Sequence, residues 1–303
     1  MQTQYTYPAV LADSERIHWR VEDLIGGEKQ LDFQKPFLPE SLARVDGAPG
    51  LSASERRTLN QIRGHGYLYT FGLVEEFILP FVLDHARPQL QADEHRIRAL
   101  LQFASEEAKH IHLFRRFRAD FTSRFGTECR VIGPPREIAR NVLAHHPLAV
   151  ALVILQIEWM TQRHYVDSTR DDHTLDPQFS SLLRHHWMEE AQHAKLDTLI
   201  VEALAAASRP EEIDRALDEY LEIGGLLDGG LGQQAAFDVE SLEHATGRRL
   251  DAVTHAEIEA QQRQALRWTF LGSGMTHPNF LATVESLRPA ARARFEEIAP
   301  TFC

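Results

Sequence analysis

The sequence predicts an all-α protein built around a four-helix bundle. Four long helical patterns follow one another with short connections, three of them begin with a recognisable helix start, and no stretch alternates like a β-strand. The chain has 303 residues, of which 43% are hydrophobic and 25% charged. This is the composition of an ordinary globular protein that is large enough for a sizeable core.

The helix starts come from capping residues and prolines. Ser52 and Glu55 have the spacing of a capping box, in which each side chain satisfies a free amide at the helix start. Pro147 suits the first turn of a third helix, and Asp176-Pro177 supplies a cap and a first-turn proline for the fourth. The expected helices cover residues 52–86, 92–125, 147–169 and 176–207.

The segments on either side of the bundle have a different character. Residues 1–51 contain most of the early Pro and Gly and show weak periodicity, so we expect an N-terminal arm packed over the core. Residues 208–303 predict three or four shorter accessory helices that pack on the bundle. We expect breaks at Gly224-Gly225, Gly229-Gly230, Gly247 and the stretch 274–278. The bundle itself is assigned to residues 52–207.

Charge and composition exclude several classes of protein. A net charge of −12 argues against nucleic acid as a partner, because phosphate backbones are bound by clusters of Lys and Arg. Two cysteines are too few for a disulfide framework or a Cys-rich metal site. The N-terminus resembles no signal peptide, and the longest apolar stretch, 147–155, is shorter than the roughly 18 residues of a membrane span. We expect a cytoplasmic protein that has no membrane partner.

Two Glu-x-x-His elements are the most informative motif of the chain. They are Glu107-Ala-Lys-His110 and Glu190-Ala-Gln-His193, on the second and fourth expected helices. The chain contains three such matches where about 1.4 are expected by chance, and the third lies in the polar N-terminal stretch. His186 joins the second element at positions i, i+4 and i+7 of one helix face. Such a triplet is much rarer than a pair.

The other two helices each offer a carboxylate in an apolar run. Glu158 lies between Ile157 and Trp159, and a lone carboxylate there loses several kcal/mol of hydration unless it is protonated, paired or bound to metal. The first helix offers Glu75 and Glu76, which precede Glu107 by 32 and 31 residues, close to the 32 residues from Glu158 to Glu190. The pattern leaves both glutamates open, although only one should face the metals.

Each candidate also has a plain structural interpretation. Glu107 and His110 can belong to an exposed polar face, the histidines of the fourth helix can form a partner-bonded cluster, and Glu158 can pair with Lys or Arg. Taken together, the repeated spacing and apolar setting favour a dinuclear carboxylate site in the bundle. Its candidate ligands are Glu75, Glu76, Glu107, His110, Glu158, His186, Glu190 and His193.

The ligand types indicate which metal the site would take. Carboxylates suit hard cations and imidazoles suit first-row transition metals, so the mixed set favours iron or manganese over a closed zinc site. We expect two Fe ions (Fe²⁺/Fe³⁺), or a Mn/Fe pair, with O2 as co-substrate. No Gly-x-Gly-x-x-Gly fingerprint is present, so electrons are expected from an external donor or reductase.

The ordered set of motifs resembles the p-aminobenzoate N-oxygenase family of ferritin-like non-haem di-iron oxygenases. The order is Glu, Glu-x-x-His, Glu, and then a His four residues before the last Glu-x-x-His, a position that His186 occupies here. The family's Asp-Glu-x-Arg-His motif appears in this chain as Glu106-Glu107-Ala-Lys109-His110. The resemblance covers residues 52–207 and implies a ferritin-like bundle that oxidises a small molecule at an amine nitrogen.

Other functions use the same ligand types. A di-iron hydroxylase or desaturase of carbon substrates and a manganese–iron oxidase remain alternatives to N-oxygenation. An iron oxidation or storage protein is usually little more than one bundle, whereas nearly 100 residues follow the fourth helix here. A metal-free helical scaffold predicts a cation beside Glu158 and a protein without metal. A homodimer is compatible with all of these functions.

Overall fold

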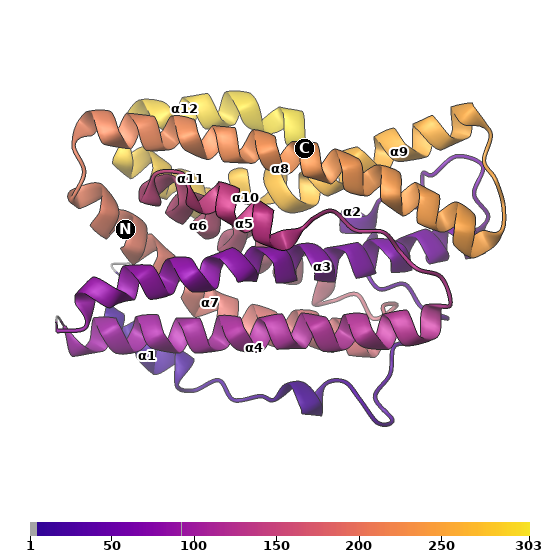
Figure 1. Ribbon diagram of the computed structural model, residues 1–303, viewed down its shortest axis with the longest axis horizontal. Coiled ribbons are helices and arrows are strands. Elements are labelled where there is room, and N and C mark those ends of the chain that lie inside the picture. The colour runs from indigo at the N-terminus through magenta and orange to yellow at the C-terminus, as the bar shows by residue number, and fades with distance from the viewer. Residues whose placement is uncertain (1–4, 92) are drawn as a thin grey trace.

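The computed structural model describes residues 5–91 and 93–303 of the chain. Figure 1 shows that these residues form helices joined by turns, and within the described ranges the only β-type pairing is one isolated bridge, Gly26 to Lys29. The prediction of an all-α, four-helix bundle with an N-terminal arm and additional C-terminal helices is confirmed. The predicted start of the second helix at residue 92 lies outside the described residues.

The four bundle helices lie close to the predicted ranges. They are α3 (Ala53–Ala86), α4 (Glu94–Phe125), α6 (Pro147–Arg163) and α7 (Pro177–Ala206); a π-helical segment, η3 (His164–Thr169), extends α6. The capping box is present, because the Ser52 hydroxyl accepts from the Glu55 amide at 3.3 Å. The Asp176 carboxylate caps α7 by accepting from the Phe179 amide at 2.6 Å.

The bundle consists of two hairpins with different neighbours on its two sides. Helices α3 and α4 form one hairpin and α6 and α7 the other, and α4 also contacts α7. On the side of α3 and α6, α5 (Pro135–Leu143) and α8 (Pro210–Thr246) each contact both helices. In Figure 1, α5 and α8 lie along the side of α3 that faces away from α4.

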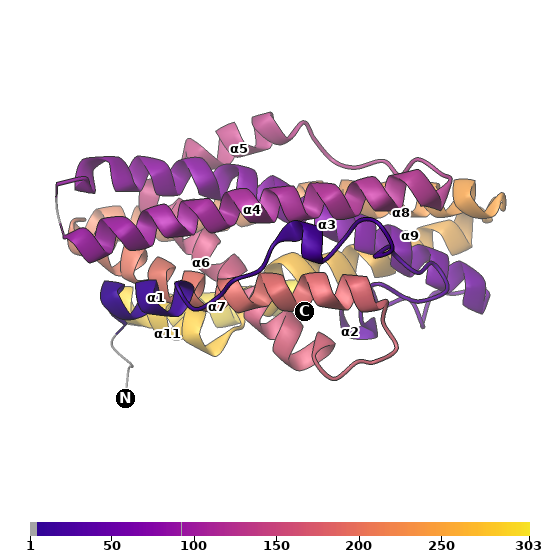
Figure 2. The same cartoon turned by 90° about the horizontal axis from the view of Figure 1, so that it is seen from below.

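The N-terminal arm contains α1 (Tyr7–Ser14), η1 (Val21–Asp23) and α2 (Glu40–Ala43). Its first part covers the opposite side of the bundle, whereas α2 contacts α3 and the C-terminal part of the chain. Helix α1 packs on α4 and α7, and η1 packs on α4, as Figure 2 shows. Farther along, the Asn60 carboxamide of α3 accepts from the Phe37 and Leu38 amides at 2.7 and 3.0 Å. The arm is therefore fixed to the bundle by buried polar contacts.

The C-terminal part contains five α-helices where three or four shorter ones were predicted, and the first of them is long. No break occurs at Gly224-Gly225 or Gly229-Gly230, since α8 is continuous over 37 residues. A helical glycine costs about 1 kcal/mol relative to alanine, and burial of an apolar face of α8 against α3 and α6 offsets this cost. The predicted break at Gly247 is correct, because this residue ends α8 with φ +64°.

Shorter elements complete the fold around the bundle. After α8 the chain forms α9 (Ala252–Arg267), the π-helical η4 (Trp268–Gly272), α10 (Ser273–Met275), α11 (Pro278–Leu287), α12 (Pro289–Ile298) and η5 (Ala299–Phe302). A further short turn, η2 (Arg87–Gln89), follows α3. Side chains from the arm, the bundle and the C-terminal helices belong to one contiguous hydrophobic core.

Within residues 5–91 and 93–303, one helical stretch is long and apolar enough to cross a membrane. It spans Ala53–Gln89, and 67% of its most apolar window is buried inside the fold. This burial is typical of the central helix of a globular protein, which passes the same test of length and composition.

Candidate metal centre

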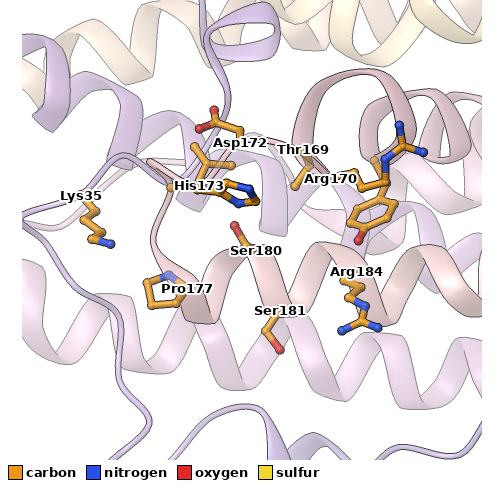
Figure 3. Close-up of a pocket in the computed structure, with 11 residues that line it drawn as sticks. Lys35, Thr169, Arg170, Asp172, His173, Pro177, Ser180, Ser181 and Arg184 are labelled. Carbon is orange, nitrogen blue, oxygen red and sulfur yellow. The ribbon is translucent and has the colours of Figure 1, made fainter.

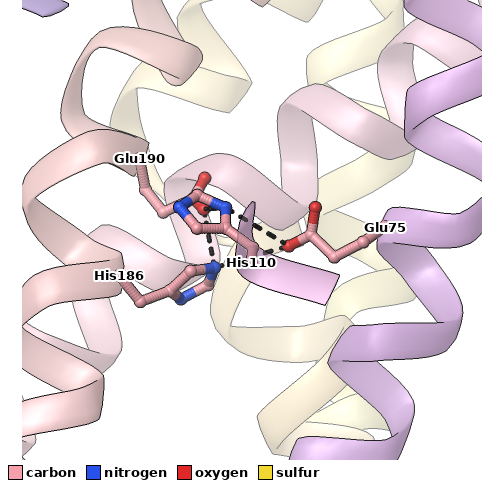
Figure 4. A group of neighbouring side chains, drawn as sticks. All are labelled: Glu75, His110, His186 and Glu190. Carbon is pink, nitrogen blue, oxygen red and sulfur yellow. Dashed lines mark hydrogen bonds and ion pairs between the residues drawn. The ribbon is translucent and has the colours of Figure 1, made fainter. Parts of the chain in front are cut away.

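Six of the predicted ligands come together at the centre of the bundle. They are Glu75 from α3, Glu107 and His110 from α4, and His186, Glu190 and His193 from α7. All six side chains are buried. Figure 4 shows Glu75, His110, His186 and Glu190 pointing toward one another from three helices. The candidate ligands that the i, i+3, i+4 and i+7 spacings place on one face of each helix therefore point toward a common centre.

The ligand atoms fall into two overlapping groups. One group is Glu75, His110, His186 and Glu190; the other is Glu107, His110, Glu190 and His193. Within each group, one donor atom per residue lies within 4.8 Å of all the others. Two overlapping groups are the arrangement expected of two neighbouring ions that share ligands.

Glu190 lies between the two groups. Its Oε1 atom lies 2.6 Å from Nε2 of His186 and 3.1 Å from Nδ1 of His110. Its Oε2 atom lies 3.1 Å from Nδ1 of His193. The two carboxylate oxygens thus face different histidines, as a bridging carboxylate requires.

Several of these buried atoms have no hydrogen-bond partner among the described residues. They are Oε2 of Glu75, both carboxylate oxygens of Glu107, Nδ1 of His110, Oε2 of Glu158 and Oε1 of Glu190. Nδ1 of His193 lies only 3.0 Å from Oε1 of Glu107, yet that oxygen receives no aligned hydrogen bond. Leaving buried polar atoms unsatisfied costs about 1–3 kcal/mol each, more for charged groups. Metal ions would satisfy all of them at once, so the residues fit a dinuclear centre.

Glu158 lies on α6 beside this cluster and is 1% exposed. Burial, followed by the negative charge of Glu190 and a hydrogen bond with it, raises the pKa of Glu158 well above its usual value. The metal-free scaffold predicted a Lys or Arg partner, but the hydrogen-bonding partner here is another carboxyl group. A buried pair of carboxyl groups is costly without a cation between them.

The two adjacent glutamates of α3 have different surroundings. Glu75 is buried and lies in the cluster, with Oε1 3.4 Å from Nε2 of His186. Glu76 lies outside it and forms an ion pair with Arg115 at 2.7 Å, with its side chain 33% exposed. Glu75 is therefore the glutamate of α3 that can reach the ions.

A second layer of carboxylates crosses between the hairpins. Nε2 of His110 lies 2.8 Å from Glu189, which precedes Glu190 on α7. Nε2 of His193 lies 2.8 Å from Glu106, which precedes Glu107 on α4. Each histidine thus contacts the glutamate that precedes the candidate ligand on the other helix, and its Nδ1 atom is left facing the cluster. We call Glu106 and Glu189 the outer glutamates.

No role was predicted for these outer glutamates from the sequence. The signal was available, because both motifs read Glu-Glu-x-x-His. Lys109 also donates to Glu189, and Ser14 of the arm donates to Glu106 at 2.5 Å. Asp197, which was also missed, is fully buried one turn beyond His193, and neither of its carboxylate oxygens has a described partner.

Proton affinities in the cluster follow these contacts. Burial opposes protonation of His110, but the hydrogen bond to Glu189 and the nearby carboxylate of Glu190 raise its pKa to about 9. The pKa of His193 is likewise raised well above its usual value by Glu190 and Glu106, against the effect of burial. Burial lowers the pKa of His186. Protons on His110 and His193 therefore partly balance the carboxylates when no metal is bound.

The arm closes the histidine side of the centre. The indole ring of Trp19 stacks on His110 with ring centroids 6.1 Å apart and an interplanar angle of 6°. The ammonium of Lys109 lies 4.0 Å from the centroid of the Trp19 ring. The Trp19 ring therefore stacks on His110 and in turn holds the Lys109 ammonium.

The comparisons with known proteins find likeness only at the level of solved structures. No protein-family model and no curated protein matches the chain. The structure is similar to R2-like ligand-binding oxidases, one with an anaerobically reconstituted Mn/Fe cofactor at 14% identity and one with an aerobically reconstituted Fe/Fe cofactor at 15%. Each match covers 88% of this chain and 94% of the other, with a TM-score of 0.47. We therefore infer the chemistry from this chain's own residues.

Proposed function

We propose that the chain binds two first-row transition metal ions, Fe/Fe or Mn/Fe, and uses O2 to oxidise a small organic substrate. The observation that carries this proposal is the buried convergence of carboxylates and imidazoles, several of whose donor atoms have no other described partner. Oxygen and imidazole ligands without thiolates suit iron and manganese.

The residues divide between two ion positions. Glu75, His110, His186 and Glu190 would hold one ion, and Glu107, Glu190 and His193 would hold the other. Glu158, which is buried beside this second group, would also help to hold the second ion. When bound, the two ions would supply the electrons that reduce O2. Glu106 and Glu189 accept the Nε2 protons of the histidines and so keep their Nδ1 atoms free to bind.

The finer assignment is N-oxygenation of an amine, which rests on the resemblance of the ordered motifs to the p-aminobenzoate N-oxygenase family. Hydroxylation or desaturation of a carbon substrate uses the same centre and stays an alternative. Every turnover that reduces O2 by more electrons than the substrate gives up needs an external reductant. A separate electron donor is therefore part of the proposal.

Metal analysis combined with O2 consumption tests this function. Protein reconstituted anaerobically with ferrous iron, or with manganese and iron, should retain about two ions per chain after removal of free metal, following the two ligand groups. It should then consume O2 when a chemical reductant is supplied. Glu190→Ala should lose both ions, because Glu190 belongs to both groups.

Glu76→Ala is the matched control, because it removes an adjacent carboxylate that contacts Arg115 instead. This variant should keep both ions and the O2 consumption. Protein that retains no metal would overturn the proposal in favour of a scaffold. Continued uptake of iron far beyond two ions per chain would indicate a storage protein instead.

A further inference from the structure

Two pockets of the described residues are candidates for a substrate site. Figure 3 shows the first, a polar pocket of about 570 Å³ formed by the start of α7 and the turn after η3. Its lining includes Lys35, Arg170, Asp172, His173 and Arg184. The second is an apolar cavity of about 260 Å³ on the α3 and α6 side of the bundle. No residue of the metal cluster lines either pocket, but only the second has lining residues that are adjacent in sequence to candidate ligands.

The apolar cavity is bordered by α3 and α6, the helices that carry Glu75 and Glu158. Its walls come from α3, α5, α6, α8 and η4. On the bundle side it is lined by Val74 of α3 and Ile157 of α6. These residues directly precede Glu75 and Glu158 in the chain. The cavity therefore contacts both helices within one residue of these two carboxylates.

An aromatic pair separates the cavity from the first ion position. Phe270 of η4 lines the cavity, and its ring centroid lies 5.8 Å from that of Phe71. The Phe71 ring in turn packs edge-on against His186, with centroids 5.4 Å apart. Two side chains therefore connect the cavity wall to a candidate ligand. Phe270 belongs to a π-helical segment, a geometry that is frequent at functional sites.

The lining is apolar and uncharged. Among the described residues around the cavity, the polar side chains are Thr70, Asn141 and Gln233, and none of the lining residues carries a charge. Thr70 already donates to the Gly66 carbonyl at 3.0 Å, while Asn141 and Gln233 are exposed, as is Leu226 at 58%. Asn141 and Gln233 thus lie at the solvent end, and the inner part is apolar except for the Thr70 hydroxyl, whose proton is already donated.

We propose that this cavity is the substrate site of the centre and that it takes an uncharged, largely apolar small molecule with its polar group toward Asn141 and Gln233. The inference rests on the proposed oxidase function for its chemistry, although binding itself can be measured without turnover. The volume lies slightly below the range of about 300–1,000 Å³ that drug-sized ligands occupy, so the molecule is small.

The charge of the substrate follows from the lining. Transfer of an ionised group into an apolar site without a partner costs several kcal/mol. A benzoate-type anion would find no cation inside this cavity, whereas a neutral arylamine or a hydrocarbon would need none. The substrate class therefore differs from the anionic aminobenzoate for which the resembling family is named.

Binding of fluoronaphthalene, followed by fluorine NMR, tests the cavity directly. Gly230 lines the cavity, and a Cβ atom there would lie 3.4 Å from Cδ1 of Ile132, so Gly230→Leu fills the space. Gly229→Leu is the matched control, because it makes the same change one residue earlier, where a Cβ atom meets nothing within 4 Å. Wild type and Gly229→Leu should bind alike, and Gly230→Leu should bind at least about tenfold more weakly.

Charge and distance provide two further readouts. Naphthoate should bind about a hundredfold more weakly than fluoronaphthalene, since its carboxylate has no partner in the cavity. When Mn²⁺ or Fe²⁺ is loaded, the fluorine signal of the bound probe should relax faster than in metal-free protein, which reports that the probe lies near the ions.

The outcomes separate this inference from the proposed function. Equal binding to wild type and Gly230→Leu, or equal binding of naphthoate and fluoronaphthalene, would overturn the assignment of the cavity. Metal loading without any change in fluorine relaxation would place the probe away from the centre and would also overturn it. Protein that binds the probe but retains no metal would contradict the oxidase proposal and leave the binding cavity intact.

Discussion

The Nε2 atom of His110 on α4 lies 2.8 Å from the carboxylate of Glu189 on α7. This contact joins the two hairpins of the bundle and leaves Nδ1 of His110 facing the cluster. The pair formed by His193 and Glu106 repeats the arrangement in the opposite direction, also at 2.8 Å. The two outer glutamates therefore orient the imidazoles that face the metal positions.

Replacing an outer glutamate should weaken metal binding without removing a ligand. Glu189→Gln and Glu106→Gln lose the charged acceptor that holds the histidine ring, and such outer partners are worth about tenfold to a hundredfold in metal affinity. Competition with a coloured chelator during ferrous or manganous titration measures this change. Glu76→Gln, whose carboxylate contacts Arg115, should titrate like the wild type, and an equal loss in all three variants would count against the orienting role.

Glu158→Gln should have opposite effects on stability and on metal binding. The folded pKa of Glu158 is raised, so this carboxyl group destabilises the metal-free fold at pH values above its unfolded pKa. The amide removes that cost, and metal-free Glu158→Gln should be more stable than the wild type at about pH 7, with the difference disappearing below about pH 4.

The same variant should retain fewer than two ions, because the second position loses a ligand. Urea unfolding of metal-free protein across pH, together with metal analysis, measures both effects. A variant that is less stable at neutral pH and still binds two ions would show that Glu158 has a structural role.

Metal uptake should release protons and strengthen with rising pH. The pKa of His110 is raised to about 9, and that of His193 is also raised, so both rings are protonated in metal-free protein near neutral pH. An ion must displace these protons, and the apparent affinity should rise up to about tenfold per pH unit for each displaced proton. Calorimetry in buffers of different ionisation enthalpy counts the released protons, and an affinity independent of pH between about 6 and 8 would contradict this account.

Two glycines should respond to alanine in opposite ways. A Cβ atom at Gly274 would lie 2.5 Å from the backbone oxygen of Gln156, where α10 meets α6, so Gly274→Ala should destabilise the fold by about 1–3 kcal/mol. Gly224 lies in the interior of α8, and a Cβ atom there would meet nothing within 4 Å. Gly224→Ala should stabilise by up to about 1 kcal/mol. Denaturant unfolding measures both, and destabilisation by Gly224→Ala would show that α8 needs the glycine.

Local signals in the sequence were sufficient for the bundle helices and for most of the candidate ligands. Ser52 and Asp176 cap the helices that they were expected to begin, because capping depends on residues only a few positions apart. The spacing of Glu107 and His110, and of His186, Glu190 and His193, places each set on one face of its helix. Ligation of metal by these residues stays a prediction.

Local sequence patterns did not predict the features of the structure that depend on packing between distant segments. The glycines of α8 suggested breaks, but contacts with α3 and α6 keep this helix continuous. The outer glutamates were overlooked because they contact histidines 79 and 87 residues away, on the other hairpin. The apolar cavity likewise combines residues from five elements and has no signature in any one of them.

The sequence by itself determined the helices, their order and the residue types that can meet at the centre, because these follow from periodicity and capping along a single helix. Only the tertiary structure decided that Glu75 faces the cluster while Glu76 contacts Arg115. Helix α3 is buried on nearly all sides around residues 59–71, so its apolar pattern carries little information about rotation. The rotation of α3 about its axis is set by packing against α4, α5 and α8, and that packing places one of two adjacent carboxylates at the metal positions.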